Sequence, residues 1–148
     1  MMRWPFAALA AIAALLASCS SAPQAPDPAA LEAGALARIQ AIPAASPEKY
    51  RGMKDMRNWR NPYLIVKSDG VALLDYNNHE ERLLKPEELT LALGSLPPSA
   101  WPYGRVVAVA ENSVRGAADV GVKIRQNRAL VAGALESMHV LIDWVPST

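Results

Sequence analysis

Few side chains in this sequence have the type and spacing that chemistry requires. The chain has one cysteine, Cys19, and two histidines, His79 and His139. Neither histidine belongs to an H-x-x-x-H or similar spacing that would hold a metal ion. The closest acidic residues, Glu80-Glu81 and Glu87-Glu88, are sequence neighbours, and such neighbours point apart on a strand or helix. We therefore predict no catalytic residue, no cofactor and no metal site. A small hydrolase that uses His79 or His139 stays as an alternative.

Cys19 is the residue with the clearest chemical context. It follows Leu16-Ala17-Ser18, at the end of a segment that begins Met1-Met2-Arg3 and continues as an apolar run from Trp4 to Ala17. One positive charge, a short apolar stretch and small residues before a cut are typical of a secretory signal. The apolar run is about fourteen residues long, whereas a membrane-spanning helix needs roughly 20. We therefore expect a cleaved export signal over residues 1–18.

The four residues Leu16-Ala17-Ser18-Cys19 resemble the lipobox of bacterial lipoproteins. The resemblance implies that Cys19 is diacylated on its sulfur, becomes the new N-terminus and is usually acylated there as well. Because Ser20, and not Asp, follows the cysteine, it also implies an outer-membrane location facing the periplasm. Two or three acyl chains are enough for stable anchoring. The alternative is a secreted protein with an incidental cysteine, although Leu16 fits poorly into the A-x-A pattern of ordinary signal peptidase.

The processed chain is expected to be neutral and tethered. Loss of Arg3 lowers the number of basic residues from 15 to 14, which equals the 14 acidic residues. This balance gives no indication of nucleic-acid binding. Residues 19–28 contain the cysteine and a Ser-, Ala- and Pro-rich stretch without apolar periodicity, which predicts a flexible tether.

Residues 29–60 are expected to be a helical N-terminal segment. Asp27 and Pro28 form a helix start, and an apolar stripe follows at helical spacing, made of Leu31, Ala35, Ile39 and Ile42. Pro43 ends this helix. Ser46-Pro47-Glu48 repeats the start signal, which predicts a second helix from Lys49 to Arg60.

The second helical segment holds five basic residues and one acid. As a functional surface it would contact anionic lipid headgroups or the carboxylates of cell-wall peptides, through Lys49, Arg51, Lys54, Arg57 and Arg60. The simpler interpretation, which we favour, is a solvated helix whose apolar side packs on the main sheet through Tyr50, Met53, Met56 and Trp59. Trp101 and Tyr103 lie in a loop and are two more candidate residues for contact with a partner or the cell wall. In the alternative interpretation, Trp101 is buried and closes the core.

Residues 61–148 are expected to form an α+β domain. Tyr63–Lys67 and Val71–Tyr76 are β-rich runs on either side of Asp69-Gly70, a strong hairpin signal. A short third strand over 81–84 and a short helix from Pro86 follow.

The last part of the domain predicts a βαβ unit. Residues 105–111 are apolar on both faces, as in a central strand. A helix over 122–138 and a strand over 140–145 come next, so the two strands should be parallel in one sheet. Trp144, on the last strand, is expected in the core. The predicted fold is a small mixed sheet with helices packed on one face.

This order of elements resembles the periplasmic domain of the ExbD/TolR family, the small subunits of proton-driven envelope motors. The similarity lies in Tyr63–Val71, Leu84–Leu89 and Arg105–Val109 with the helix that follows. It implies that the fold transfers, together with periplasmic tasks such as dimerising, binding partner proteins or contacting peptidoglycan. The family's membrane helix and its proton-carrying aspartate have no counterpart here, so the motor role is not implied.

The sequence thus leads us to expect a lipid-anchored, non-enzymatic interaction module of the bacterial envelope. Its partners would be the membrane, through acyl chains on Cys19, and an envelope protein or a second copy of the chain. Binding to peptidoglycan is the alternative, and no nucleic acid is expected.

Overall fold

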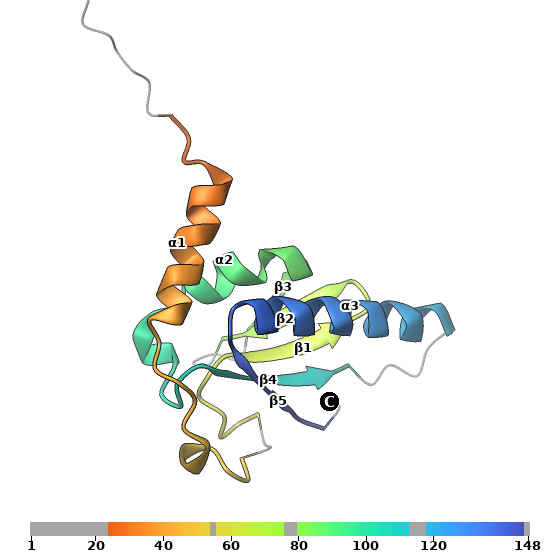
Figure 1. Ribbon diagram of the computed structural model, residues 1–148. Helices are drawn as coiled ribbons and strands as arrows, with labels where there is room; N and C mark the ends of the chain where they lie inside the picture. The colour runs from red at the N-terminus through yellow and green to blue at the C-terminus, as the bar shows by residue number, and fades with distance from the viewer. Residues whose placement is uncertain (1–23, 54–55, 76–79, 113–117, 147–148) are drawn as a thin grey trace, which may run out of the picture.

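The computed structural model describes residues 24–53, 56–75, 80–112 and 118–146. Cys19, Lys54 and His79 lie outside these residues, as do the predicted signal and most of the tether. The described elements, in chain order, are α1 (Pro28–Gln40), η1 (Pro47–Lys49), β1 (Tyr63–Lys67), β2 (Gly70–Leu74), β3 (Glu81–Leu84), η2 (Pro86–Glu88), α2 (Leu89–Gly94), η3 (Pro98–Ala100), β4 (Val106–Glu111), α3 (Ala118–Ser137) and β5 (Leu141–Trp144) (Figure 1).

The strands form one mixed sheet in the order β3-β2-β1-β4-β5. β2 pairs antiparallel with β1 and with β3, whereas β4 lies parallel to β1 and to β5. The predicted hairpin and the predicted parallel βαβ unit are therefore confirmed, and the fold is a small α+β fold. The hairpin turn requires Gly70, because a Cβ atom there would lie 2.3 Å from the carbonyl oxygen of Leu84.

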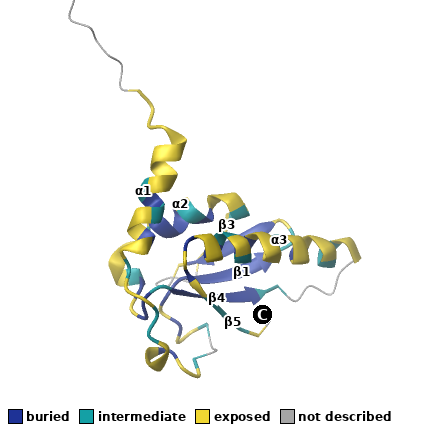
Figure 2. Cartoon of the chain, viewed as in Figure 1, coloured by how far each residue is buried: buried dark blue, intermediate teal, exposed yellow. Residues whose placement is uncertain are grey.

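Helices cover one face of the sheet, as predicted (Figures 1 and 2). The strand side chains on this face pack in one apolar cluster with residues of all three helices, including Ile39, Leu93, Ile124, Val131 and Leu135. α1 packs directly on α2, where a Cβ atom on Gly94 would come within 2.6 Å of the Cβ of Ala35. The expected inner stripe of α1 is only partly correct, because Leu31 is 46% exposed.

The C-terminal end of α3 is closed by a residue in the left-handed region. His139 has a φ of 57°, and the next amide, of Val140, donates to the carbonyl of Leu135 at 2.9 Å. This is the hydrogen bond of a Schellman cap, in which glycine usually takes the left-handed position. His139 is exposed, so its contribution here comes from its backbone.

The other face of the sheet is covered by an irregular segment with a cluster of three aromatic rings. Tyr50, Trp59 and Tyr103 stack edge to face or tilted, with ring centroids 5.3–5.8 Å apart. All three are buried against the strand side chains of this face. The prediction that Tyr50 and Trp59 pack on the sheet is confirmed.

The predicted helix from Lys49 to Arg60 is wrong. In the described part of this segment, the 3-10 turn η1 is followed by turns, and Gly52 has a φ of 81°. The positive φ of Gly52 is incompatible with a continuing helix. Tyr50 and Trp59 therefore pack on the sheet from an irregular loop. The burial of these side chains was thus predictable from the sequence, whereas the backbone conformation of the segment was not.

Asn61 joins this segment to the sheet. Its side chain is buried, donates through Nδ2 to the carbonyls of Gly104 (2.7 Å) and Val106 (2.8 Å), and accepts from the amide of Tyr103 at 2.9 Å. Pro62 follows and has no N–H to offer the parallel partner strand, and the Asn61 amide supplies a donor to that strand in its place.

The predicted boundary between residues 29–60 and 61–148 is not a boundary in the packing. α1 belongs to the same apolar cluster as the sheet and α3, and residues 45–59 pack on the opposite face of the same sheet. The described residues from Pro28 onward therefore share their core.

Candidate functional site

Four of the predicted basic contact residues lie on the loop that covers the second face of the sheet. Lys49, Arg51, Arg57 and Arg60 are exposed, while the neighbouring Tyr50 and Trp59 are buried. The aromatic side chains hold the loop against the sheet, and the basic side chains near them lie on its outer surface. Figure 1 places this loop at the end of the molecule opposite to the start of α1. Lys54, the fifth predicted contact, lies outside the described residues.

Trp101 and Tyr103, predicted as candidate contacts, do not lie on the surface. Trp101 is 4% exposed and packs in the core under the helices, and Tyr103 is 7% exposed in the aromatic cluster. The Tyr103 hydroxyl donates to the backbone carbonyl of Asn58 at 3.2 Å. The interpretation of Trp101 as a core-closing residue is therefore confirmed, and its assignment as an exposed contact is wrong.

Among the residues that the structure describes, the exposed aromatic side chain is instead that of Trp144, which had been expected in the core. It lies on β5 at one edge of the sheet and is 38% exposed. The guanidinium carbon of Arg128 on α3 lies 4.2 Å from the Trp144 ring centroid, and the same guanidinium bonds Glu111 Oε1 at 2.6 Å. Leu141, at the other end of β5, is 50% exposed. Trp144 remains at the surface because β5 is the last strand, so one side of it has no neighbouring strand in the sheet.

The two edges of the sheet differ in character. β3 at one edge presents Glu81 and Arg82 beside Leu83, which is 50% exposed, and Glu81 forms an ion pair with Lys67 of β1. Charged side chains of this kind keep an edge strand from pairing with another chain. β5 at the other edge presents Leu141 and Trp144. The backbone amides of Leu141 and Val145 donate to β4, so in this parallel strand the peptide N–H and C=O groups of Ile142 and Trp144, at the alternate positions, face outward.

A groove runs along one end of the sheet. One hollow of about 280 Å³ is lined by residues from the ends of β2 and β3 and by Leu96, which follows α2. A second hollow of about 360 Å³ shares Leu74, Asp75 and Leu96 with the first and extends past Arg60 to Ala100. The two hollows are neighbours with apolar sides and charged groups at the rim, and the first of them, lined by Arg82 and Asp75, is called the groove below.

The described residues contain no group of three or more His, Cys, Asp or Glu side chains that could hold a metal ion. Within the same described ranges, no helix has the length and hydrophobicity needed to cross a membrane.

No protein-family model, no curated protein and no solved structure matches this chain. The likeness to the ExbD/TolR periplasmic domain therefore stays a prediction from the order of elements.

Three features of the site escaped the sequence analysis: the Asn61 hub, the partnership of Arg128 with Trp144, and the groove. Each brings together residues that are far apart in the chain. Asn61-Pro62 directly before a strand was the one local signal, because a proline in a paired position needs a substitute donor.

Proposed function

We propose that this protein is a lipid-anchored, non-enzymatic interaction module of the bacterial cell envelope. It is anchored in the outer membrane through acyl chains on Cys19, and it contacts a protein partner through β5. The observation that carries this proposal is the contrast between the two edges of the sheet: β3 has the charged Glu81 and Arg82 beside its exposed Leu83, whereas β5 exposes Leu141 together with Trp144, over which Arg128 lies. Trp and Arg dominate the binding energy of protein interfaces, and Arg128 stacks on Trp144.

The occupant that fits β5 is an extended strand of an envelope protein. Strand addition supplies backbone hydrogen bonds from the outward-facing peptide groups, and side-chain pockets supply specificity. The Trp144 ring with the Arg128 guanidinium over it would receive a side chain of that strand. β5 has four residues, which suits a short segment of the partner more than a large interface.

The shape of the N-terminal region supports a tethered arrangement. The first turns of α1 extend away from the sheet (Figure 1) and are exposed (Figure 2). Asp27 caps α1 by accepting from the amide of Ala29 at 3.2 Å, and Pro28 starts the helix. A chain that enters the domain at this end leaves β5 accessible to a partner.

The edge proposal is tested by site-specific photo-crosslinking in intact cells. A photoreactive residue at position 144 should give a discrete crosslinked product, and the same residue at position 83 on β3 should not. Leu83 is a matched control because it is an edge-strand residue of similar exposure, 50%. The variant Trp144→Lys should abolish the product formed from position 141. Equal crosslinking from both edges, or none from β5, would contradict the proposal.

The anchor is tested separately. Metabolic labelling with palmitate should mark the unaltered protein and not Cys19→Ser, and only the former should sediment with outer membranes. Labelling of neither would refute the lipid anchor and leave the edge experiment interpretable.

A second candidate function, binding to peptidoglycan, is favoured by the basic loop. Its exposed cations lie at the end of the domain opposite to the start of α1 (Figure 1), so a domain tethered from α1 presents them away from its anchoring membrane. Co-sedimentation with purified cell wall should then be lost in Arg57→Glu/Arg60→Glu and kept in Lys123→Glu/Arg125→Glu, which changes two exposed cations of α3. Retention by the loop variant would remove this candidate.

A further inference from the structure

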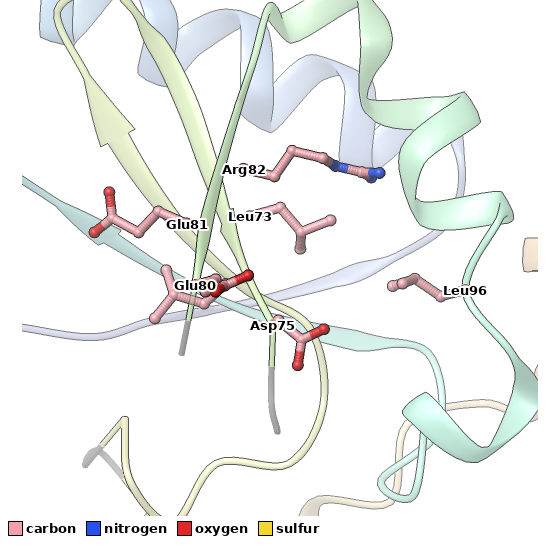
Figure 3. Close-up of a pocket in the computed structure, with 7 residues that line it drawn as sticks. Leu73, Asp75, Glu80, Glu81, Arg82 and Leu96 are labelled. Atoms are coloured by element: carbon pink, nitrogen blue, oxygen red, sulfur yellow. The ribbon is translucent and has the colours of Figure 1, made fainter. Parts of the chain in front are cut away.

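The groove at the end of the sheet has opposite charges on either side of an apolar floor. Arg82 is the register partner of Leu73 across β2 and β3, and residues directly opposite each other share a face of the sheet. Asp75 stands two positions after Leu73, so it lies on that face as well. Figure 3 shows the side chains of Arg82, Leu73 and Asp75 extending toward Leu96, while Glu81 points to the other side.

The Arg82 guanidinium is available to a ligand. Arg82 is exposed, and in the part of the chain that the structure describes, no hydrogen bond or ion pair engages its side chain. Arg128 on α3, by contrast, is paired with Glu111 of β4. An arginine without a partner beside a hollow is suited to a planar carboxylate, which it can bind with two parallel hydrogen bonds.

The opposite end of the groove favours a positive charge. Asp75 and Glu80 lie next to each other, because the amide of Asp75 donates to the carbonyl of Glu80 at 2.9 Å. Both residues line the hollow. With Arg82 at one end and two carboxylates at the other, the groove offers both signs of charge to a ligand.

The backbone positions of Arg82 and Asp75 are close enough for a peptide of two residues to lie between their side chains. Diagonal neighbours on adjacent strands are about 7–8 Å apart, and two extended residues span about 7 Å. The hollow that Arg82 and Asp75 line has a volume of about 280 Å³, near the lower end of small-molecule sites, which begin at about 300 Å³. Leu73 and Leu96 offer an apolar surface between the charges.

We infer that this groove binds a short peptide with free termini. The terminal carboxylate pairs with Arg82, the terminal ammonium lies beside Asp75 and Glu80, and an apolar side chain contacts Leu73 and Leu96. This site is separate from β5 and from the acylated cysteine, so it stands or fails independently of the function proposed above.

The test is an NMR titration of the purified protein with the dipeptide Ala-Leu, followed through the methyl groups of Leu73 and Leu96. Millimolar dipeptide should shift these methyl signals. The N-acetyl derivative and the C-terminal amide should each bind about tenfold more weakly, as expected for the loss of one charge-assisted hydrogen bond. Absence of shifts at millimolar dipeptide, or equal binding of the blocked derivatives, would overturn the inference.

Two variants assign the charged ends. Arg82→Met should weaken binding of the free dipeptide about tenfold and leave binding of the C-terminal amide unchanged. Asp75→Asn should likewise weaken binding of the free dipeptide about tenfold and leave binding of the N-acetyl derivative unchanged. Arg125→Met, which removes an exposed arginine from α3, is the matched control and should bind as the unaltered protein does. Loss of binding in Arg60→Met but not in Arg82→Met would refute the assignment of Arg82. All variants replace exposed side chains, so an unchanged amide spectrum outside the groove is the check on folding.

Discussion

Replacing Asn61 by alanine should lower the free energy of unfolding by about 2–6 kcal/mol. The Asn61 side chain serves three backbone groups: the carbonyls of Gly104 and Val106 and the amide of Tyr103. The carbonyl of Gly104 also accepts from the amide of Val106 at 2.8 Å, so it keeps a partner in the variant. The other two groups become unpaired in a buried place, at about 1–3 kcal/mol each. The total free energy of unfolding of a typical domain is about 5–15 kcal/mol, so this loss is a large part of it.

The matched comparison is Asn127→Ala. Asn127 also donates through Nδ2 to two carbonyls, those of Lys67 (2.8 Å) and Ser68 (3.3 Å), but it is only partly buried. Water can replace its amide, so a loss of about 0.5–1.5 kcal/mol is expected. Urea denaturation of the purified proteins, followed by tryptophan fluorescence, measures both changes. Equal losses for Asn61→Ala and Asn127→Ala would refute the role of Asn61 as a buried hub.

Asn61→Asp adds a test by pH. The new carboxyl can still accept from Tyr103, but its second oxygen faces the carbonyls of Gly104 and Val106, where only a protonated group can donate. Burial and these carbonyls raise the pKa of the new carboxyl in the folded state above its unfolded value of about 3.9. The folded state then binds more protons, so stability falls as the pH rises from about 4 through the raised pKa. A deficit that shrinks toward neutral pH would contradict this reasoning.

The remaining predictions concern packing and backbone conformation. Trp59→Ala should lower the free energy of unfolding by about 3–5 kcal/mol, because the ring is 3% exposed and its Nε1 donates to the carbonyl of Pro62. Thermal denaturation measures this loss, and a loss below about 1 kcal/mol would show that the aromatic cluster is not part of the core. His139→Gly should raise stability by about 0.5–1 kcal/mol, since φ is 57° there, whereas His139→Ala should not; an equal effect of both would exclude the backbone explanation. Gly94→Ala should cost about 1–3 kcal/mol by overpacking against Ala35, and faster proteolysis within α1 is the expected sign; unchanged protection of α1 would contradict it.

Local patterns predicted most of the regular structure. The Asp69-Gly70 signal, the alternating and continuous apolar runs and the proline-started helices indicated the hairpin, the parallel βαβ unit and the helix-covered face, all of which the structure confirms. These signals act over a few residues, where backbone preference and the burial of one face determine the conformation.

The candidate sites were less predictable, because they depend on which strand lies at an edge. Trp144 was expected in the core from its apolar strand, and Trp101 was offered as a contact from its loop, yet their exposures are 38% and 4%. An apolar strand has the same pattern whether a neighbour lies on one side of it or on two. A loop tryptophan is buried or exposed according to what packs on it from elsewhere in the chain.

The sequence by itself determined the strands of the sheet, the helices on its covered face and their order, and the one thiol that a lipid anchor would use. The tertiary structure decided that a loop and three aromatic rings, instead of a helix, close the second face of the sheet. It also decided that Arg82 and Asp75 share a groove with Leu96. The physical reason is range: turns and caps are set by neighbours in the chain, whereas faces, edges and hollows arise only when distant segments compete for the same apolar surface.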